Sequence, residues 1–235
     1  ILKRFMEKEI KEYYSRFKEI YNKENYPRWF EHQAIFNQQF DATGYDNNKK
    51  IHTLGHWAIL QNQIPEKIEI VMVGKNNSWF DKKDMSKALE IVKEIEEDIP
   101  KQDHHLQKSN FANKLNATFK KVGKQNKRAE EILRSNRVGM NRIWVQTGTS
   151  LSSNVDIELI NQCTSWTKEI IRLLNPKLVL LFGREEKFSA WELFDDYEQN
   201  EKFAVRHCWH PVGNKTGLNP DIILGGMKDQ KANLI

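Results

Sequence analysis

Cysteine is scarce in this sequence: Cys163 and Cys208 are the two found in 235 residues. Two thiols are too few for a disulfide framework, a four-cysteine zinc site or an all-cysteine iron–sulfur cluster. Long apolar runs are also missing, since stretches such as 178–182 fall far short of the roughly 20 residues that span a bilayer. No basic start followed by an apolar segment and a cleavage site is visible. We therefore expect a cytoplasmic protein that does not enter a membrane.

Three common enzyme signatures are absent as well. The sequence has no Walker loop for nucleoside triphosphates, no GxGxxG turn for dinucleotides and no GxSxG nucleophile elbow. Nucleotide hydrolysis, dinucleotide redox chemistry and serine-hydrolase chemistry thus lack their motifs, and we expect neither a cofactor nor a bound metal. The 37 basic residues outnumber the 32 acidic ones, which permits nucleic-acid binding without requiring it.

What the sequence does contain is typical of a folded globular protein: 39% hydrophobic residues and a mean hydropathy of −0.73. Short apolar runs of strand length alternate with longer segments whose apolar residues recur at helical spacing. The pattern predicts strands over 68–73 (ending at Gly74), 138–146, 177–182 and 203–208. It predicts helices over 1–22, 27–40, 84–98, 105–120, 127–135, 156–174 and 185–194, with a loop over 41–50.

Strands that alternate with helices of this length indicate a parallel sheet covered by helices. We expect an α/β fold of three layers, α/β/α, with a mostly parallel central sheet of about four strands. Residues 66–235 are predicted to form this α/β domain, and residues 1–65 a helical N-terminal extension packed on its core. A single large domain is compatible with the chain length, because about 150 residues per domain is only a soft guide.

Ligands of such sheets bind beyond the carboxyl ends of the strands. Three segments of the sequence fall at such ends: GKNNSW (74–79), the stretch from Asn141 onward, and HPVG (210–213). Taken singly, a Gly/Asn cluster or a His-Pro pair is an ordinary turn after a strand. Their common position at one edge of the sheet predicts a single site that holds all three.

Together with NPK (175–177), whose strand ends at Gly183, these motifs follow an order that resembles the uracil-DNA glycosylase superfamily. In that superfamily a Gly-x-Asn-Pro or Gly-x-Asp-Pro motif follows a strand, and a middle strand supplies an Asn. A late His-Pro-Ser then opens the loop that enters DNA. The resemblance covers residues 66–215 and departs from the pattern at Asn77, in place of Pro, and at Val212, in place of Ser.

The resemblance implies a monofunctional DNA glycosylase, which flips a pyrimidine out of the stack and hydrolyses its N-glycosidic bond to leave an abasic site. It implies that Asn76 positions the attacking water and that His210 donates to the base oxygen, where negative charge develops. Asn141 would read the flipped base with an amide that both donates and accepts. Trp79 or Phe80 would supply an aromatic floor.

The resemblance leaves the substrate base open. Ser78 stands where strict uracil enzymes carry a Tyr that blocks a 5-methyl group. The small side chain implies a roomier pocket, so a 5-modified pyrimidine, such as a modified cytosine of phage DNA, has at least equal weight with uracil. Either substrate is compatible with a role in DNA repair or in antiviral defence. We expect the protein to be a monomer.

Positive charge is concentrated near these motifs, and together with the resemblance it favours DNA as the partner. The run between 120 and 137 also includes Arg134. A solvated helical face explains a charge run of this kind as well. The predicted DNA contacts are Lys75, Lys120, Lys121, Lys124, Lys127, Arg128, Arg137, Pro211, Gly213, Asn214 and Lys215.

Two other functions remain open. A catalytically inactive DNA-binding module of the same fold would explain the departures at Asn77 and Val212. A metal-dependent nuclease would use carboxylates outside the motifs. Its candidate ligands are Asp46, Asp81 and Asp84. His207, Cys208 and His210 also have metal-ligand residue types, but an extended strand would not bring the two histidines together on one side.

Overall fold

The structure is a computed structural model that describes residues 2–20, 24–25, 59, 64–78, 110–147, 156–183, 189–194, 201–212 and 217–235. Residues 2–3, 14, 18, 76–78 and 145–147 are described by their backbone alone. The helices predicted over 27–40 and 84–98 and the loop predicted over 41–50 lie outside the described residues.

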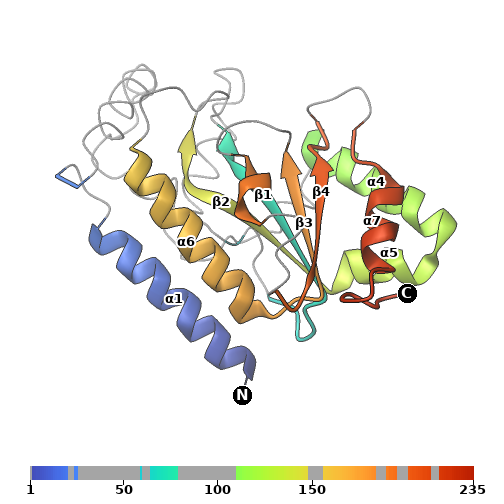
Figure 1. Ribbon diagram of the computed structural model, residues 1–235, viewed down its shortest axis with the longest axis horizontal. Helices are drawn as coiled ribbons and strands as arrows, with labels where there is room; N and C mark the ends of the chain where they lie inside the picture. The colour runs from blue at the N-terminus through green and yellow to red at the C-terminus, as the bar shows by residue number, and fades with distance from the viewer. Residues whose placement is uncertain are drawn as a thin grey trace, which may run out of the picture.

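Helices and strands alternate along the described chain (Figure 1). In chain order the elements are α1 (Leu2–Ile20), β1 (Ile70–Ser78), α4 (Asn110–Gln125), α5 (Lys127–Ser135), β2 (Arg137–Thr147), α6 (Ile157–Leu174), β3 (Leu178–Gly183), the 3₁₀ helix η3 (Ala190–Leu193), β4 (Ala204–Trp209) and α7 (Pro220–Met227). No helix in the described ranges is long and apolar enough to cross a membrane.

The strands form one four-stranded sheet in the order β2-β1-β3-β4, and every neighbouring pair is parallel. Ile70 of β1 lies between Arg137 of β2 and Leu178 of β3. Because the strands run the same way, their carboxyl ends lie along one edge, drawn at the top of Figure 1. The predicted α/β fold is confirmed, with a sheet that is parallel throughout.

Helices cover both faces of the sheet and so make three layers (Figure 1). The face toward α1 and α6, called the α6 face below, carries Val71, Val73, Val138, Met140, Val179, Leu181 and Val205. The face toward α4, α5 and α7, called the α4 face, carries Ile70, Met72, Leu178, Leu180, Phe182, Ala204 and Cys208. Successive strand residues point to opposite faces, so one continuous apolar run supplies both cores.

The N-terminal helix α1 contributes to the core on the α6 face. Its apolar residues Met6, Ile10 and Phe17 are buried. The Phe17 ring lies 5.6 Å from the Trp144 ring and 6.4 Å from the Trp166 ring, centroid to centroid. The helix predicted over 1–22 is thus confirmed for residues 2–20, and the helical spacing of its apolar residues marks the side that packs beside α6.

The prediction that the first strand ends at Gly74 is wrong. β1 continues to Ser78, and its backbone keeps pairing with β2: Gly74 lies opposite Asn141, and Asn76 opposite Ile143. The apolar pattern stops at Gly74, but a ladder needs only backbone N–H and C=O groups. The 11 residues of β2 supply these partners for polar residues as well.

Two predicted helices have different extents in the structure. The helix predicted over 105–120 is described from Asn110 and continues to Gln125. Of the helix predicted over 185–194, the described part is the short η3. The Ser189 hydroxyl caps η3 by accepting from the Trp191 backbone N–H at 3.3 Å.

The C-terminal helix α7 was not predicted. Its start carries the expected signals: Asn219 accepts from the Asp221 backbone N–H at 2.9 Å, and Pro220 occupies the first turn. The glycines at 225 and 226 interrupt the apolar pattern, so the spacing of apolar residues does not predict this helix. Gly226 is needed for close packing, because a methyl group there would lie 2.9 Å from the Arg206 Cγ atom.

Glu69 lies at the amino edge of the sheet with its carboxylate buried, and it binds residues that precede two other strands. Glu69 is 3% exposed; Asn136 Nδ2 donates to it at 2.6 Å, and Lys67 Nζ pairs with it at 2.5 Å. Its backbone carbonyl accepts from the N–H groups of Lys177 and Leu178, at 3.0 Å each. Burial raises the pKa of Glu69, but the hydrogen bonds from Lys67 and Asn136 outweigh it and keep the pKa below its usual value.

Glu69→Gln is expected to lower the free energy of unfolding at neutral pH by about 1–3 kcal/mol, because it removes the charge that Lys67 and Asn136 bind. The folded-state pKa lies below the unfolded one, so this stabilisation is present above about pH 4.5 and fades as the pH falls through the folded pKa. Urea unfolding should therefore show a difference between wild type and variant that shrinks toward pH 3. Glu130→Gln, at a surface pair with Arg134, is the control. A difference that stays constant with pH would contradict this account.

Candidate functional site

The predicted site lies at the carboxyl edge of the sheet, on the α4 face. Asn141 lies opposite Gly74 within the sheet, not at a strand end as predicted, because β2 continues to Thr147. Asn141 is 3% exposed, and a methyl group built on Gly74 would stand 3.4 Å from its Oδ1 atom. The missing side chain of Gly74 thus leaves room for the Asn141 amide.

His210 follows the last residue of β4 and is held through both its backbone and its ring. Its backbone N–H donates to the Gly183 carbonyl at 3.1 Å, which extends the β3–β4 pairing by one bond. Its ring Nδ1 accepts from the Val212 backbone N–H at 3.2 Å. A ring nitrogen that accepts carries no proton, so the neutral imidazole bears its proton on Nε2 and presents a donor there. The turn after His210 thereby selects the tautomer.

Phe111, an aromatic residue that the sequence analysis did not single out, supports His210. The Phe111 ring, at the start of α4, lies 5.3 Å from the His210 ring and 6.2 Å from the Phe182 ring, centroid to centroid. Phe111 shares a helical face with the buried Leu115 and Phe119. In the sequence it is one member of an ordinary apolar stripe, and no local signal marks it as the one that meets a histidine.

In register, Asn141, Gly74, Phe182 and Cys208 form a row across the α4 face, and His210 follows two residues after Cys208. Adjacent strands lie about 4.8 Å apart, so the backbones of β2 and β4, at the two sides of the sheet, are separated by about 14 Å. The Asn141 amide stands at one end of this row, and the His210 imidazole lies beyond its other end, beside Phe111.

Other predicted site residues lie around this row. Asn76 lies in β1, where its backbone pairs with β2, and Ser78 lies in the same strand, beyond a shift in the register with β2. Lys75 is half-buried, and the alternation of β1 puts it on the α6 face with Val73. Pro211 is buried. The described residues do not include Trp79, Phe80, Gly213, Asn214 or Lys215.

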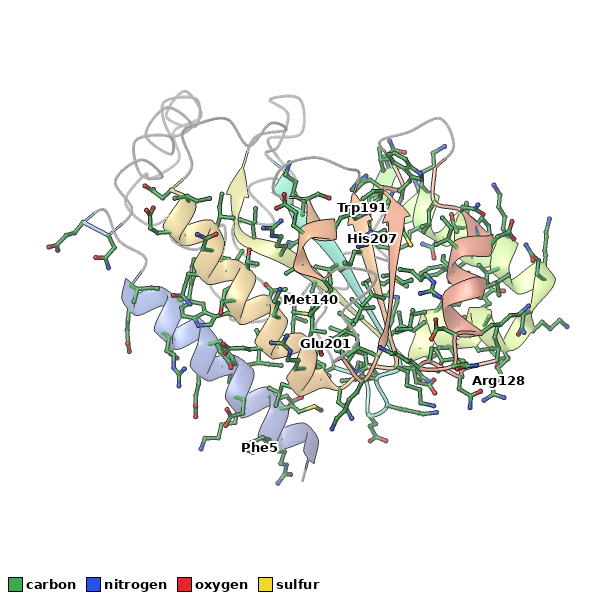
Figure 2. The ribbon with its side chains drawn as sticks, viewed as in Figure 1. Phe5, Arg128, Met140, Trp191, Glu201 and His207 are labelled. Carbon is green, nitrogen blue, oxygen red and sulfur yellow. The ribbon has the colours of Figure 1, made fainter. Side chains whose placement is uncertain are left out.

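The predicted basic run lies along α4 and α5 and leads away from the carboxyl edge. Its exposed members are Lys120, Lys121, Lys124, Lys127, Arg128 and Arg134. Figure 2 shows Arg128 far from Trp191 and His207, which lie toward the carboxyl ends of the strands. Lys114, which the sequence analysis did not include, is also exposed on α4 and lies one turn from Phe111.

Two residues of the basic run differ from the others: Arg137 is buried, and Arg134 is exposed but binds other side chains of the protein. Arg137 is 2% exposed at the start of β2, which corrects the expectation that it contacts DNA. Arg137 belongs to the same strand as the buried Val138 and Met140, and it is buried with them. Arg134 pairs with Glu130 at 2.7 Å and donates to Asn116 at 3.1 Å.

The histidines with metal-ligand residue types face different parts of the protein. The His207 Nε2 lies 3.1 Å from the Phe194 carbonyl, and the His207 ring stacks on Trp191 in η3. His210 instead packs on Phe111 of α4. Across the described ranges, no three His, Cys, Asp or Glu side chains gather as a metal site.

Comparison of the sequence with known proteins finds no matching protein-family model and no matching curated protein. The likeness to uracil-DNA glycosylases therefore rests on the motifs and their order. The structure adds their position: the first motif lies on β1, Asn141 on β2, Gly183 on β3 and His210 directly after β4.

Substitution of Gly74 tests the space in front of the Asn141 amide. Gly74→Ala should fold with stability unchanged or raised by about 0.5–1 kcal/mol, because glycine within a strand costs about that much relative to alanine. Gly74→Val should displace the amide, since its added methyl groups extend past the 3.4 Å contact with Asn141 Oδ1. The side-chain amide resonance of Asn141, assigned with Asn141→Ala, should move more in Gly74→Val than in Gly74→Ala. An unmoved resonance in Gly74→Val would place the amide elsewhere.

Proposed function

We propose that the protein is a DNA glycosylase that takes a pyrimidine out of the stack and hydrolyses its N-glycosidic bond. The observation that carries this proposal is the hydrogen bond from the Val212 N–H to His210 Nδ1, which leaves Nε2 as the donor, on a backbone that Gly183 holds at the carboxyl edge of the sheet. When the bond breaks, negative charge develops on the oxygen of the departing base. A fixed N–H donor facing that oxygen lowers the barrier electrostatically.

The reaction balances without a cofactor. The C1′–N bond breaks with both electrons leaving on the base, water forms the new bond to C1′, and the proton of that water is released. We assign the water to Asn76, whose amide can hold it but is a poor base, so stabilisation of the leaving base carries most of the rate. Burial raises the pKa of the Cys163 thiol to about 12, so no thiolate is available there to compete with water as the nucleophile.

The proposed substrate is uracil or, with at least equal weight, a pyrimidine enlarged at C5. The Asn141 amide both donates and accepts, as recognition of a pyrimidine edge requires. A small residue at Ser78 favours a pocket that tolerates a C5 substituent, and Trp79 or Phe80 is proposed as the stacking surface. The corresponding role is DNA repair or defence against phage with modified DNA.

Helix α4 is proposed to align DNA with the site. Phe111 beside His210 and the exposed lysines lie on this one helix. At a rise of about 1.5 Å per residue, Lys120 lies about 14 Å and Lys124 about 20 Å from Phe111 along the axis. Phosphates of one strand repeat about every 3.4 Å, so these lysines would meet phosphates about four to six nucleotides from the flipped base.

A rival function is a DNA-binding module of the same fold without activity. The residues that favour it are Asn77 and Val212, which stand where the resembled superfamily carries Pro and Ser. Under both proposals DNA is the partner and the protein is a cytoplasmic monomer. Only the enzyme releases a base.

His210→Ala is expected to reduce single-turnover base release by about 100- to 1,000-fold, the usual cost of one transition-state donor, while DNA binding persists. The assay uses labelled DNA with uracil, mismatched thymine, 5-hydroxymethyl pyrimidines or glucosylated phage bases, in EDTA, with hot alkali to cut abasic sites. Lys228→Ala, an exposed residue outside the site, is the control. DNA that is bound but never loses a base supports the inactive module, and cleavage that EDTA abolishes supports a metal-dependent nuclease.

Lys120→Gln with Lys124→Gln is expected to weaken DNA binding and to reduce the slope of log affinity against log salt by about 1.8, since each phosphate contact contributes about 0.9. Lys202→Gln with Lys228→Gln changes the net charge equally at exposed positions outside α4 and α5. Fluorescence anisotropy over a range of salt concentrations measures both pairs. If both pairs of substitutions lower the DNA affinity equally, net charge alone determines binding, and α4 is not the helix that contacts DNA.

A further inference from the structure

Trp191 in η3 joins the carboxyl ends of β3 and β4. Its indole N–H lies 3.0 Å from the Leu181 carbonyl and 3.2 Å from the Cys208 carbonyl, so one donor serves both strands. Its ring stacks on His207, at 5.0 Å between centroids and 8° between planes, and meets Trp209 at 5.5 Å and 60°. Figure 2 shows Trp191 and His207 together on these strands. One side chain therefore contacts the three residues of β4 that precede the site histidine.

A buried arginine holds η3 in this place. Arg142 of β2 is 5% exposed, and its Nε–H donates to the Thr164 hydroxyl of α6 at 3.0 Å. Its Nη1 donates to the Ser189 carbonyl and pairs with Glu192 at 2.8 Å. Ser189 and Glu192 flank Trp191, so the guanidinium fixes both sides of it. A charge buried in this way is stable because its partners satisfy its donors.

Gly183 connects η3 to the backbone of the site histidine. A methyl group at Gly183 would collide with the Ser189 hydroxyl, so only glycine allows η3 to close on the end of β3. The same Gly183 accepts from the His210 backbone N–H at 3.1 Å. A displacement of η3 would therefore reach His210 through Gly183 as well as through β4.

We propose that Trp191 is a positioning residue for His210. By donating to the ends of β3 and β4, it fixes the direction in which the His210 ring presents its Nε2–H. Arg142 acts one step further back, by holding η3. The catalytic meaning of this inference rests on the proposed function, whereas the positioning itself is a property of the folded chain.

The indole N–H is the part of Trp191 that this role needs. A phenylalanine could still stack on His207, but it would leave the Leu181 and Cys208 carbonyls without their shared donor. Trp191 lies on the α6 face and His210 on the α4 face, so Trp191 acts without touching the base. A misplacement of about 1 Å at a reacting group can cost about 100-fold in rate, so even a small shift is measurable.

Trp191→Phe tests the proposal, with Trp166→Phe as the matched control in the same core. Trp166 packs on Phe17 and Trp144, away from the ends of β3 and β4. In nitrogen-15-labelled protein, the ring nitrogens of His210, assigned with His210→Gln, report which one carries the proton. Wild type and Trp166→Phe should show a protonated Nε2 and an unprotonated Nδ1. Trp191→Phe should show exchange between the two tautomers.

Activity provides the second readout. Trp191→Phe should slow single-turnover base release by about 10- to 100-fold and leave the dissociation constant for DNA within about twofold, because a positioning residue does not bind the ligand. An unchanged His210 tautomer in folded Trp191→Phe overturns the inference. If the tautomer changes as expected but wild type releases no base from any DNA, the positioning stands and the proposed function fails.

Glu192→Ala tests the same chain of contacts if Trp191→Phe does not fold. The Glu192 side chain is 46% exposed, so its removal opens no cavity in the core. The loss of its pair with Arg142 should shift the His210 ring signals in the same direction by a smaller amount. Signals identical to wild type in this variant would also overturn the inference.

Discussion

Parallel pairing of four buried strands is the constraint on which the rest of this structure depends. Parallel neighbours cannot be joined by a tight turn, so the chain crosses over between them and its helices cover both faces of the sheet. The strands must then be apolar on both faces: in β1, Met72 enters the core on the α4 face and Val73 the core on the α6 face. The same parallel direction gathers the strand ends, and with them His210, at one edge, while Asn141 lies within β2.

The two faces of that edge have different physical characters. On the α4 face, the Asn141 amide belongs to β2, at one end of the strand order, and the His210 imidazole follows β4, at the other end. The partly exposed ring of Phe111 lies beside His210. On the α6 face, Arg142 and Trp191 bind backbone carbonyls and neighbouring side chains, which fixes where the strands end. The groups proposed to meet a base and the groups that hold them in place are therefore separated by the sheet itself.

One departure from the glycosylase pattern has a physical explanation in this fold. The backbone N–H of Val212 orients the His210 ring, and a backbone donor is independent of whether the side chain is Ser or Val. The other departure, Asn77 in place of Pro, falls where the pairing of β1 with β2 shifts register between Asn76 and Ser78, and the structure does not explain it.

The sequence by itself determined the α/β class, the helices α1, α5 and α6, and the approximate positions of all four strands. Hydrophobic periodicity reports which residues face a core, and that property is local. Only the tertiary structure decided where β1 ends and that Arg137 is buried. It also decided that Phe111 contacts His210 and that Trp191 contacts β4, the strand before His210. These features depend on backbone partners and side chains from distant parts of the chain, and the spacing of residues along one segment carries no information about what packs against it.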